Sequence, residues 1–115
     1  MTWSRDDKLE IYAALIAAVP NLDLKGKTVR YTSMNGNMFS FLSKDGELAF
    51  RLGSVDREAF LERYPDAVVE QYGSVMKDYV AITDPVLDDD TELTRLFATS
   101  VANARTLQAK PTKRR

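Results

Sequence analysis

Residues 28–52, TVRYTSMNGNMFSFLSKDGELAFRL, decide the fold of this chain of 115 residues. The stretch is rich in β-branched and aromatic residues, and two turn dipeptides, Asn35-Gly36 and Asp45-Gly46, divide it into three strands. Asn-Gly and Asp-Gly favour two-residue hairpin turns of type I′, because both central positions of that turn need a positive φ. The expected strands span residues 28–34, 38–42 and 47–52.

Two-residue turns would also fix which residues face one another across this antiparallel meander. Counting outward from the second turn pairs Phe41 with Phe50 and Phe39 with Leu52, and this face is predicted to be the core. The opposite face is mixed in character, as expected for a sheet face that is partly wet. Its expected residues are Val29, Tyr31, Met38, Ser40, Leu42, Ala49 and Arg51.

Apolar residues recur at helical spacing in three other segments. Ser4 and Asp7 have the spacing of a capping box before the first helix, and Pro20 stops it. Asp89 and Glu92 have a similar spacing at the start of the last helix. The expected helices span residues 5–19, 54–64 and, after Pro85, up to about 107; further strands span residues 67–71 and 78–83. The second helix is expected to bury Val55, Phe60, Leu61 and Tyr64.

The predicted order is therefore α-β-β-β-α-β-β-α, with helices set against a mainly antiparallel, five-stranded sheet. This arrangement defines an α+β fold. Since no linker or repeat divides the chain, residues 1–108 are expected to form one domain. Residues 109–115, AKPTKRR, are expected to form a disordered basic tail.

Composition excludes several classes of function. Sixteen Lys and Arg against seventeen Asp and Glu give a net charge of −1, which argues against coating nucleic acid through bulk charge. The chain has no Cys, so it has no thiol nucleophile and no thiolate metal site. It also has no His, the commonest general base and the commonest zinc ligand. Nucleotide-binding and hydrolase motifs are also absent, and we expect no cofactor, no metal and no catalytic residue. No apolar run approaches the ~20 residues that span a bilayer, so the expected location is the cytoplasm, without membrane contact.

Five residues are candidates for binding a partner: Lys77, Tyr79, Arg51, Tyr31 and Met38. Lys77 and Tyr79 are expected on one face of the last strand, where an ammonium and a phenol can hold an anion or a carboxylate. An exposed Lys beside an exposed Tyr is also common on a wet sheet face without any function. Tyr31 and Met38, together with Leu42, are apolar residues on the mixed face, and such residues often mark contacts.

Three blocks in the same order resemble the TfoX N-terminal domain family and its relatives of the MmcQ/YjbR type. Residues 35–39, NGNMF, are similar to the family's G-K-M-F strand start. Residues 46–52, GELAFRL, followed by Arg57-Glu58, are similar to its strand-then-helix segment. Residues 73–80, GSVMKDYV, resemble its G-x-x-M-K-x-[WY]-V block, with Met76, Lys77 and Tyr79 as motif positions.

The resemblance implies an α+β sandwich of the YjbR-like and secretion-chaperone-like kind, with a link to regulation of bacterial competence and to DNA binding, and no catalytic residues. We therefore expect a small non-catalytic regulatory or protein-binding module that contacts a protein partner or its own copy. One alternative is weak DNA binding through Lys77, Arg51 and the basic tail. Another is an enzyme, which would need a pocket lined by paired acids.

Overall fold

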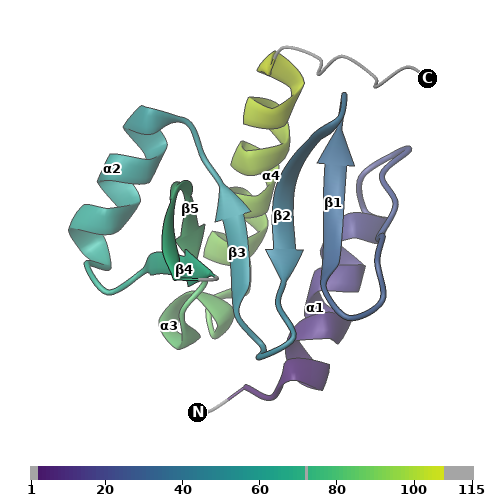
Figure 1. Cartoon of the computed structure of the whole chain (residues 1–115), viewed down its shortest axis with the longest axis horizontal. Helices are drawn as coiled ribbons and strands as arrows, with labels where there is room; N and C mark the ends of the chain where they lie inside the picture. The colour runs from purple at the N-terminus through teal and green to yellow at the C-terminus, as the bar shows by residue number, and fades with distance from the viewer. Residues whose placement is uncertain (1–2, 72, 108–115) are drawn as a thin grey trace.

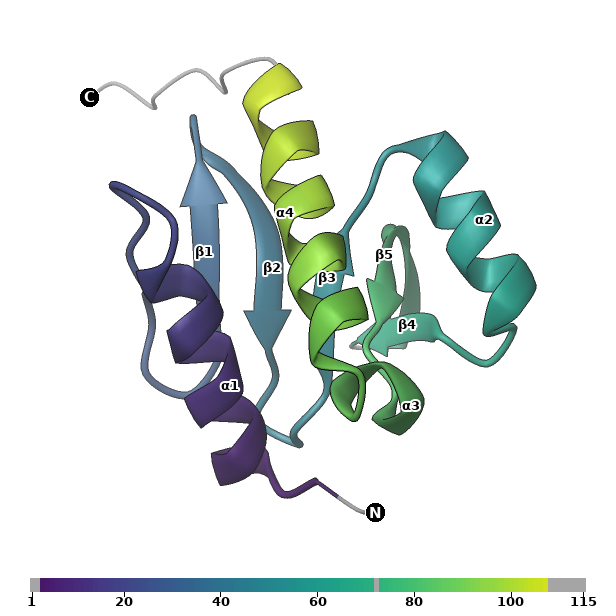
Figure 2. The same cartoon turned by 180° about the vertical axis from the view of Figure 1, so that it is seen from behind.

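The computed structural model describes residues 3–71 and 73–107. It shows an α+β fold in which five strands form one antiparallel sheet in the spatial order β1-β2-β3-β5-β4. Helices α1 and α4 lie behind β1 and β2 in Figure 1 and in front of them in Figure 2, so both cover the same sheet face. The elements are α1 (Arg5–Ala17), β1 (Arg30–Met34), β2 (Asn37–Leu42), β3 (Leu48–Arg51), α2 (Ser54–Arg63), β4 (Val68–Gln71), β5 (Ser74–Ala81), α3 (Asp84–Leu87) and α4 (Asp90–Thr106).

Helix α1 begins with the expected capping box. The Asp7 amide donates to the Ser4 hydroxyl at 3.1 Å, and the Ser4 amide donates to the Asp7 carboxylate at 3.3 Å. The helix ends at Ala17, ahead of the expected end, and Tyr12 and Ile16 are its buried residues. In the described part of the chain, no helix is long and apolar enough to cross a membrane.

The first hairpin turn is the predicted two-residue turn. Met34 pairs with Asn37, and the two residues between them have φ angles of 55° (Asn35) and 79° (Gly36). These positive values are those that the Asn-Gly dipeptide was expected to supply.

The second hairpin turn corrects the predicted register. The Ser43 amide donates to the Glu47 carbonyl at 2.9 Å, so the loop holds three residues, 44–46, and not two. Gly46, with a φ of 92°, takes the left-handed position that such three-residue loops require. Ser40 consequently faces Phe50, and Phe41 faces Ala49. The predicted pairs of Phe41 with Phe50 and of Phe39 with Leu52 are wrong by one residue.

A β-bulge in β2 overturns the second part of that prediction. Thr32 pairs with Ser40 but Ser33 pairs with Met38, so Phe39 is an extra residue in its strand. The bulge separates the two phenylalanines that were expected to share a face. The Phe39 ring lies 6.4 Å from that of Phe97 in α4, whereas the Phe41 ring lies 5.4 Å from that of Tyr79 in β5.

The core beneath α1 and α4 is built around Phe97. Its ring lies 5.1 Å from that of Phe50 and 6.4 Å from those of Tyr12 and Phe39. Edge-on and tilted ring pairs at these distances add to the stabilisation from buried area. Leu42, expected on the mixed face, is fully buried. It faces Leu48 and alternates with Phe41, which places it on the helix side of the sheet.

A buried row of hydroxyls crosses the same core. Tyr12 Oη and Ser40 Oγ are 2.6 Å apart, and Ser40 Oγ also shares a hydrogen bond with Thr32 Oγ1. All three residues are completely buried, so Ser40 is not on the mixed face where it was expected. Burial raises the pKa of Tyr12 to about 12.

The second half of the chain departs from the prediction in three places. The residue before α2 is Gly53, and Val55, expected to be buried, is 80% exposed in the first turn of that helix. Strand β5 begins at Ser74, four residues before the expected start at Asp78. Pro85 lies inside the short helix α3, because the first turn of a helix tolerates a residue without an N–H. The predicted tail, residues 109–115, lies outside the described residues.

Candidate functional site: the open sheet face

The sheet has one face that α1 and α4 do not cover, and no helix lies in front of β1, β2 and β3 in Figure 1. Cross-strand pairing places Tyr31, Phe41, Ala49 and Ala81 in one row on one side of the sheet. Since Ser40 points toward α1, its neighbour Phe41 points the opposite way. We call this side the open sheet face. Its partly exposed residues are Tyr31, Met38 and Arg51, and its buried residues are Phe41, Ala49, Tyr79 and Ala81.

Tyr79 links two strands at the centre of the open sheet face. Its hydroxyl donates to the Met38 carbonyl at 2.7 Å, which ties β5 to β2 across the intervening strand β3. Only 8% of Tyr79 is exposed, and its burial raises the pKa of the phenol to about 12. The prediction of an exposed Tyr79 is therefore wrong, and its hydroxyl is already engaged within the sheet.

Arg51 lies beside Tyr79 in the pairing of β3 with β5, and its charge is matched. Its guanidinium is 3.5 Å from the Asp78 carboxylate, which also lies 3.8 Å from that of Arg57. Arg57 is held in turn by a 2.8 Å hydrogen bond to the Leu52 carbonyl. Because Asp78 neutralises part of this charge, Arg51 has less attraction to offer a phosphate than its sequence suggested.

Lys77 differs from Tyr79 although only one residue separates them. It is exposed and makes no hydrogen bond or ion pair with any other residue that the structure describes. Tyr31 and Met38 are half-buried and remain accessible. The Tyr31 ring packs beside Gly26, whose φ of 86° and close backbone leave no space for a side chain. Of the five predicted residues, Tyr79 is thus buried, Lys77 is exposed, and Tyr31, Met38 and Arg51 are half-buried.

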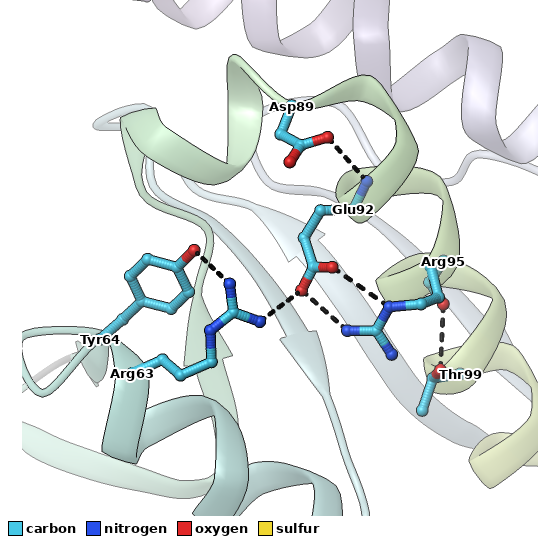
Figure 3. A network of polar contacts seen from close by, with 6 residues as sticks. All are labelled: Arg63, Tyr64, Asp89, Glu92, Arg95 and Thr99. Carbon is cyan, nitrogen blue, oxygen red and sulfur yellow. Dashed lines mark hydrogen bonds and ion pairs between the residues drawn. The ribbon is translucent and has the colours of Figure 1, made fainter.

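A second polar cluster joins α2 to α4, and sequence reasoning missed it (Figure 3). The Arg95 guanidinium donates twice to the Glu92 carboxylate, at 2.7 and 3.2 Å. Arg63 reaches the same carboxylate from α2 at 3.4 Å and also approaches the Tyr64 hydroxyl at 3.3 Å. The spacing of Glu92 and Arg95 on one helix was a visible signal, but nothing in the sequence placed Arg63 beside them.

These contacts set the charge state of the cluster. The hydrogen bond from Arg95 lowers the pKa of Glu92, and the same bond raises that of Arg95. Between the two helices lies a partly open cavity of about 90 Å³ beside the cluster. It is lined by Asp56, Ala59, Phe60, Arg63, Glu92, Arg95, Leu96 and Thr99.

A wider, shallower cavity of about 430 Å³ lies where the β2–β3 loop meets the starts of α1 and α3. Its acidic lining includes Asp45, Asp66 and Asp84, and the Lys8 ammonium donates to the Gly46 carbonyl at 2.7 Å. Within residues 3–71 and 73–107, no group of acidic side chains is placed to hold a metal ion.

No protein-family model, no curated protein and no solved structure was found to match the chain. The features of the molecule that can indicate a function are therefore its own open sheet face and the cavity between α2 and α4.

Proposed function

We propose that this chain is a non-catalytic regulatory module that binds protein through its open sheet face, and that a second copy of the chain is the occupant. The observation that carries the proposal is the partial exposure of Tyr31 and Met38, two large apolar side chains on the sheet face that α1 and α4 do not cover. Accessible apolar residues on an otherwise packed sheet are typical of contact surfaces.

Charge supports a second copy as the occupant. Arg51 is paired with Asp78, so two such faces can approach one another without a strong repulsion between unpaired arginines. The aromatic side chains of the face are rigid, because Tyr79 is bonded to Met38 and packed on Phe41. A rigid face loses little conformational entropy on association.

The polar groups do not favour catalysis. Glu92 has a lowered pKa, which keeps it ionised at neutral pH, and a general acid needs the opposite shift. A TfoX N-terminal-like identity remains part of this proposal, supported by the series of strands and helices that the resemblance implies. The short helix α3 is an addition to that series.

Sedimentation velocity over a wide range of protein concentration tests the proposal. We expect a monomer–dimer equilibrium for the native chain and a monomer for Met38→Asp. Val55→Asp is the matched control, because it places the same charge on an exposed apolar residue of α2, outside the open sheet face. A native chain that stays monomeric, or equal dissociation by both variants, contradicts the assignment.

Weak DNA binding remains the second proposal, and the free ammonium of Lys77 is the observation that favours it. Fluorescence anisotropy of a labelled DNA duplex at low and moderate salt tests it directly. Binding that weakens steeply with salt and with Lys77→Ala supports a phosphate contact. Absence of binding at low salt rejects DNA as a ligand.

A further inference from the structure

The α2–α4 cavity has a charge arrangement that the proposed function does not use. The two helices run antiparallel there, because the start of α2 (Gly53) lies beside Asn103 and its end (Arg63) lies beside Glu92. Along this seam, four charged side chains alternate in sign: Arg63, Glu92, Arg95 and Asp56. Their formal charges sum to zero, so the site favours neither a simple anion nor a simple cation.

Of the neighbouring pairs in this row, Arg95 and Asp56 are not in direct contact. Arg63, Glu92 and Arg95 are joined by hydrogen bonds (Figure 3). Asp56 and Arg95 line the same cavity and interact electrostatically, but they do not reach ion-pair distance, and Asp56 has no polar partner among the described residues. Arg95 donates to Glu92 through Nε and Nη2, which leaves Nη1 available.

The cavity between these two charges is larger than a single water needs. Its volume is about 90 Å³, whereas one water needs only ~10–15 Å³ of such space. Phe60 and Leu96, which are 4% and 3% exposed, give it an apolar wall. The cavity thus offers a carboxylate acceptor, a guanidinium donor and an apolar surface within one small space.

We propose that this cavity binds a small zwitterion of the α-amino acid class. The ligand's carboxylate faces the free donor of Arg95, its ammonium faces Asp56, and an apolar side chain lies against Phe60 and Leu96. Arg–carboxylate and ammonium–carboxylate contacts are the strong, charge-assisted kind of hydrogen bond. A ligand with both charges can bridge Arg95 and Asp56. A ligand with one charge leaves either Asp56 or the free donor of Arg95 without a partner.

Amide chemical shifts measured by NMR during titration of the full chain test this site. The probes are L-alanine and L-leucine, with acetate and methylammonium as the two singly charged halves. We expect L-leucine to shift the amides around Asp56 and Thr99 with higher affinity than L-alanine, and neither half alone to do so. Loss of one charge-assisted contact in Asp56→Asn or Arg95→Gln should weaken binding about tenfold or more.

The control variant is Glu58→Gln, which removes an exposed carboxylate from the same helix without touching the cavity lining. It should bind L-leucine as the native chain does. Absence of shifts with both amino acids overturns the proposal, and so does equal binding of acetate, which would make this a simple anion site. Unchanged affinity in Asp56→Asn also overturns it. These readouts do not depend on whether the open sheet face forms a dimer.

Discussion

The Tyr79 hydroxyl of β5 donates to the Met38 carbonyl of β2 at 2.7 Å, across the strand that lies between them. Loss of this bond in Tyr79→Phe should lower the free energy of unfolding by about 1 kcal/mol and keep the fold. Tyr79→Asp should cost clearly more, because it removes a buried ring that packs on Phe41 and puts a charged group in its place. Urea denaturation followed by circular dichroism measures both effects. A Tyr79→Phe variant as stable as the native chain would show that water replaces the bond.

Because Ser40 lies in the buried row of hydroxyls, its replacement should lower the stability of the fold more than the small size of the side chain suggests. Ser40→Ala leaves the hydroxyls of Tyr12 and Thr32 without their shared partner in a site closed to water. We expect a loss of about 1–3 kcal/mol in urea denaturation. Thr99→Ala is the control, since its half-buried hydroxyl bonds only to the Arg95 carbonyl one turn earlier. Equal effects of the two variants would contradict the role of the row.

Alkaline pH should destabilise the domain through its two buried phenols. Burial raises the pKa of Tyr12 and of Tyr79 from 10.0 to about 12, so the folded state holds these protons more tightly than the unfolded state. Their contribution to stability is complete below the ordinary pKa and disappears as the pH rises through the folded value. Thermal melts between these limits should show a falling midpoint. Phenolate absorbance should reveal two late-titrating tyrosines, and Tyr79→Phe should remove one of them.

Acid should weaken the seam between α2 and α4. Arg95, with help from Arg63, lowers the pKa of Glu92 below 4.5, so this carboxylate stabilises the fold above that value and stops doing so as the pH falls through the folded pKa. Both arginines are more than half exposed, so Glu92→Gln should cost only about 0.5–1 kcal/mol near neutral pH. Urea denaturation near neutral and in acid should show that difference vanish. A difference that persists in acid would assign the effect to packing.

Gly26 and Gly73 allow the effect of a positive φ to be separated from the effect of limited space for a side chain. Gly26 and Gly73 have φ angles of 86° and 77°, which L residues rarely adopt. A side chain at Gly26 would also lie 2.1 Å from the Val29 carbonyl oxygen and touch the Tyr31 ring, whereas one at Gly73 meets nothing within 4 Å. Gly73→Ala should cost about 1–2 kcal/mol, and Gly26→Ala clearly more. Equal losses in thermal melts would mean that the loop around Gly26 moves aside.

Local sequence patterns predicted the helices and strands well wherever the residues favour a single backbone conformation. Asn35-Gly36 defined its turn, and the capping residues Ser4 and Asp89 started their helices as expected. Asp45-Gly46 is compatible with a two-residue and with a three-residue loop, and only the completed sheet selects between them. The bulge at Phe39 has no signal in composition, because phenylalanine suits either face of a strand.

For the candidate site too, local patterns predicted which residues share a face, but not which of them are exposed or which distant residues meet. Alternation along the strands indicated that Tyr31 and Arg51 share a face, and pairing through Phe41 and Ala49 is consistent with this. Exposure was harder to predict: Tyr79 is buried, and its ring packs against that of Phe41 from a strand two places away in the sheet. Arg63 and Glu92 are 29 residues apart, and only the antiparallel packing of two helices brings them together.

The extra residue at Phe39 makes β2 a mechanical link between the two sides of the sheet. Within three consecutive residues, the strand sends one ring into the layer under α4 and another into the layer around Tyr79. The same peptide units thus position a ring against α4 and a ring on the opposite face of the sheet. The contacts of Phe41 with Tyr79 and of Phe39 with Phe97 in α4 are therefore separated by a single residue of backbone.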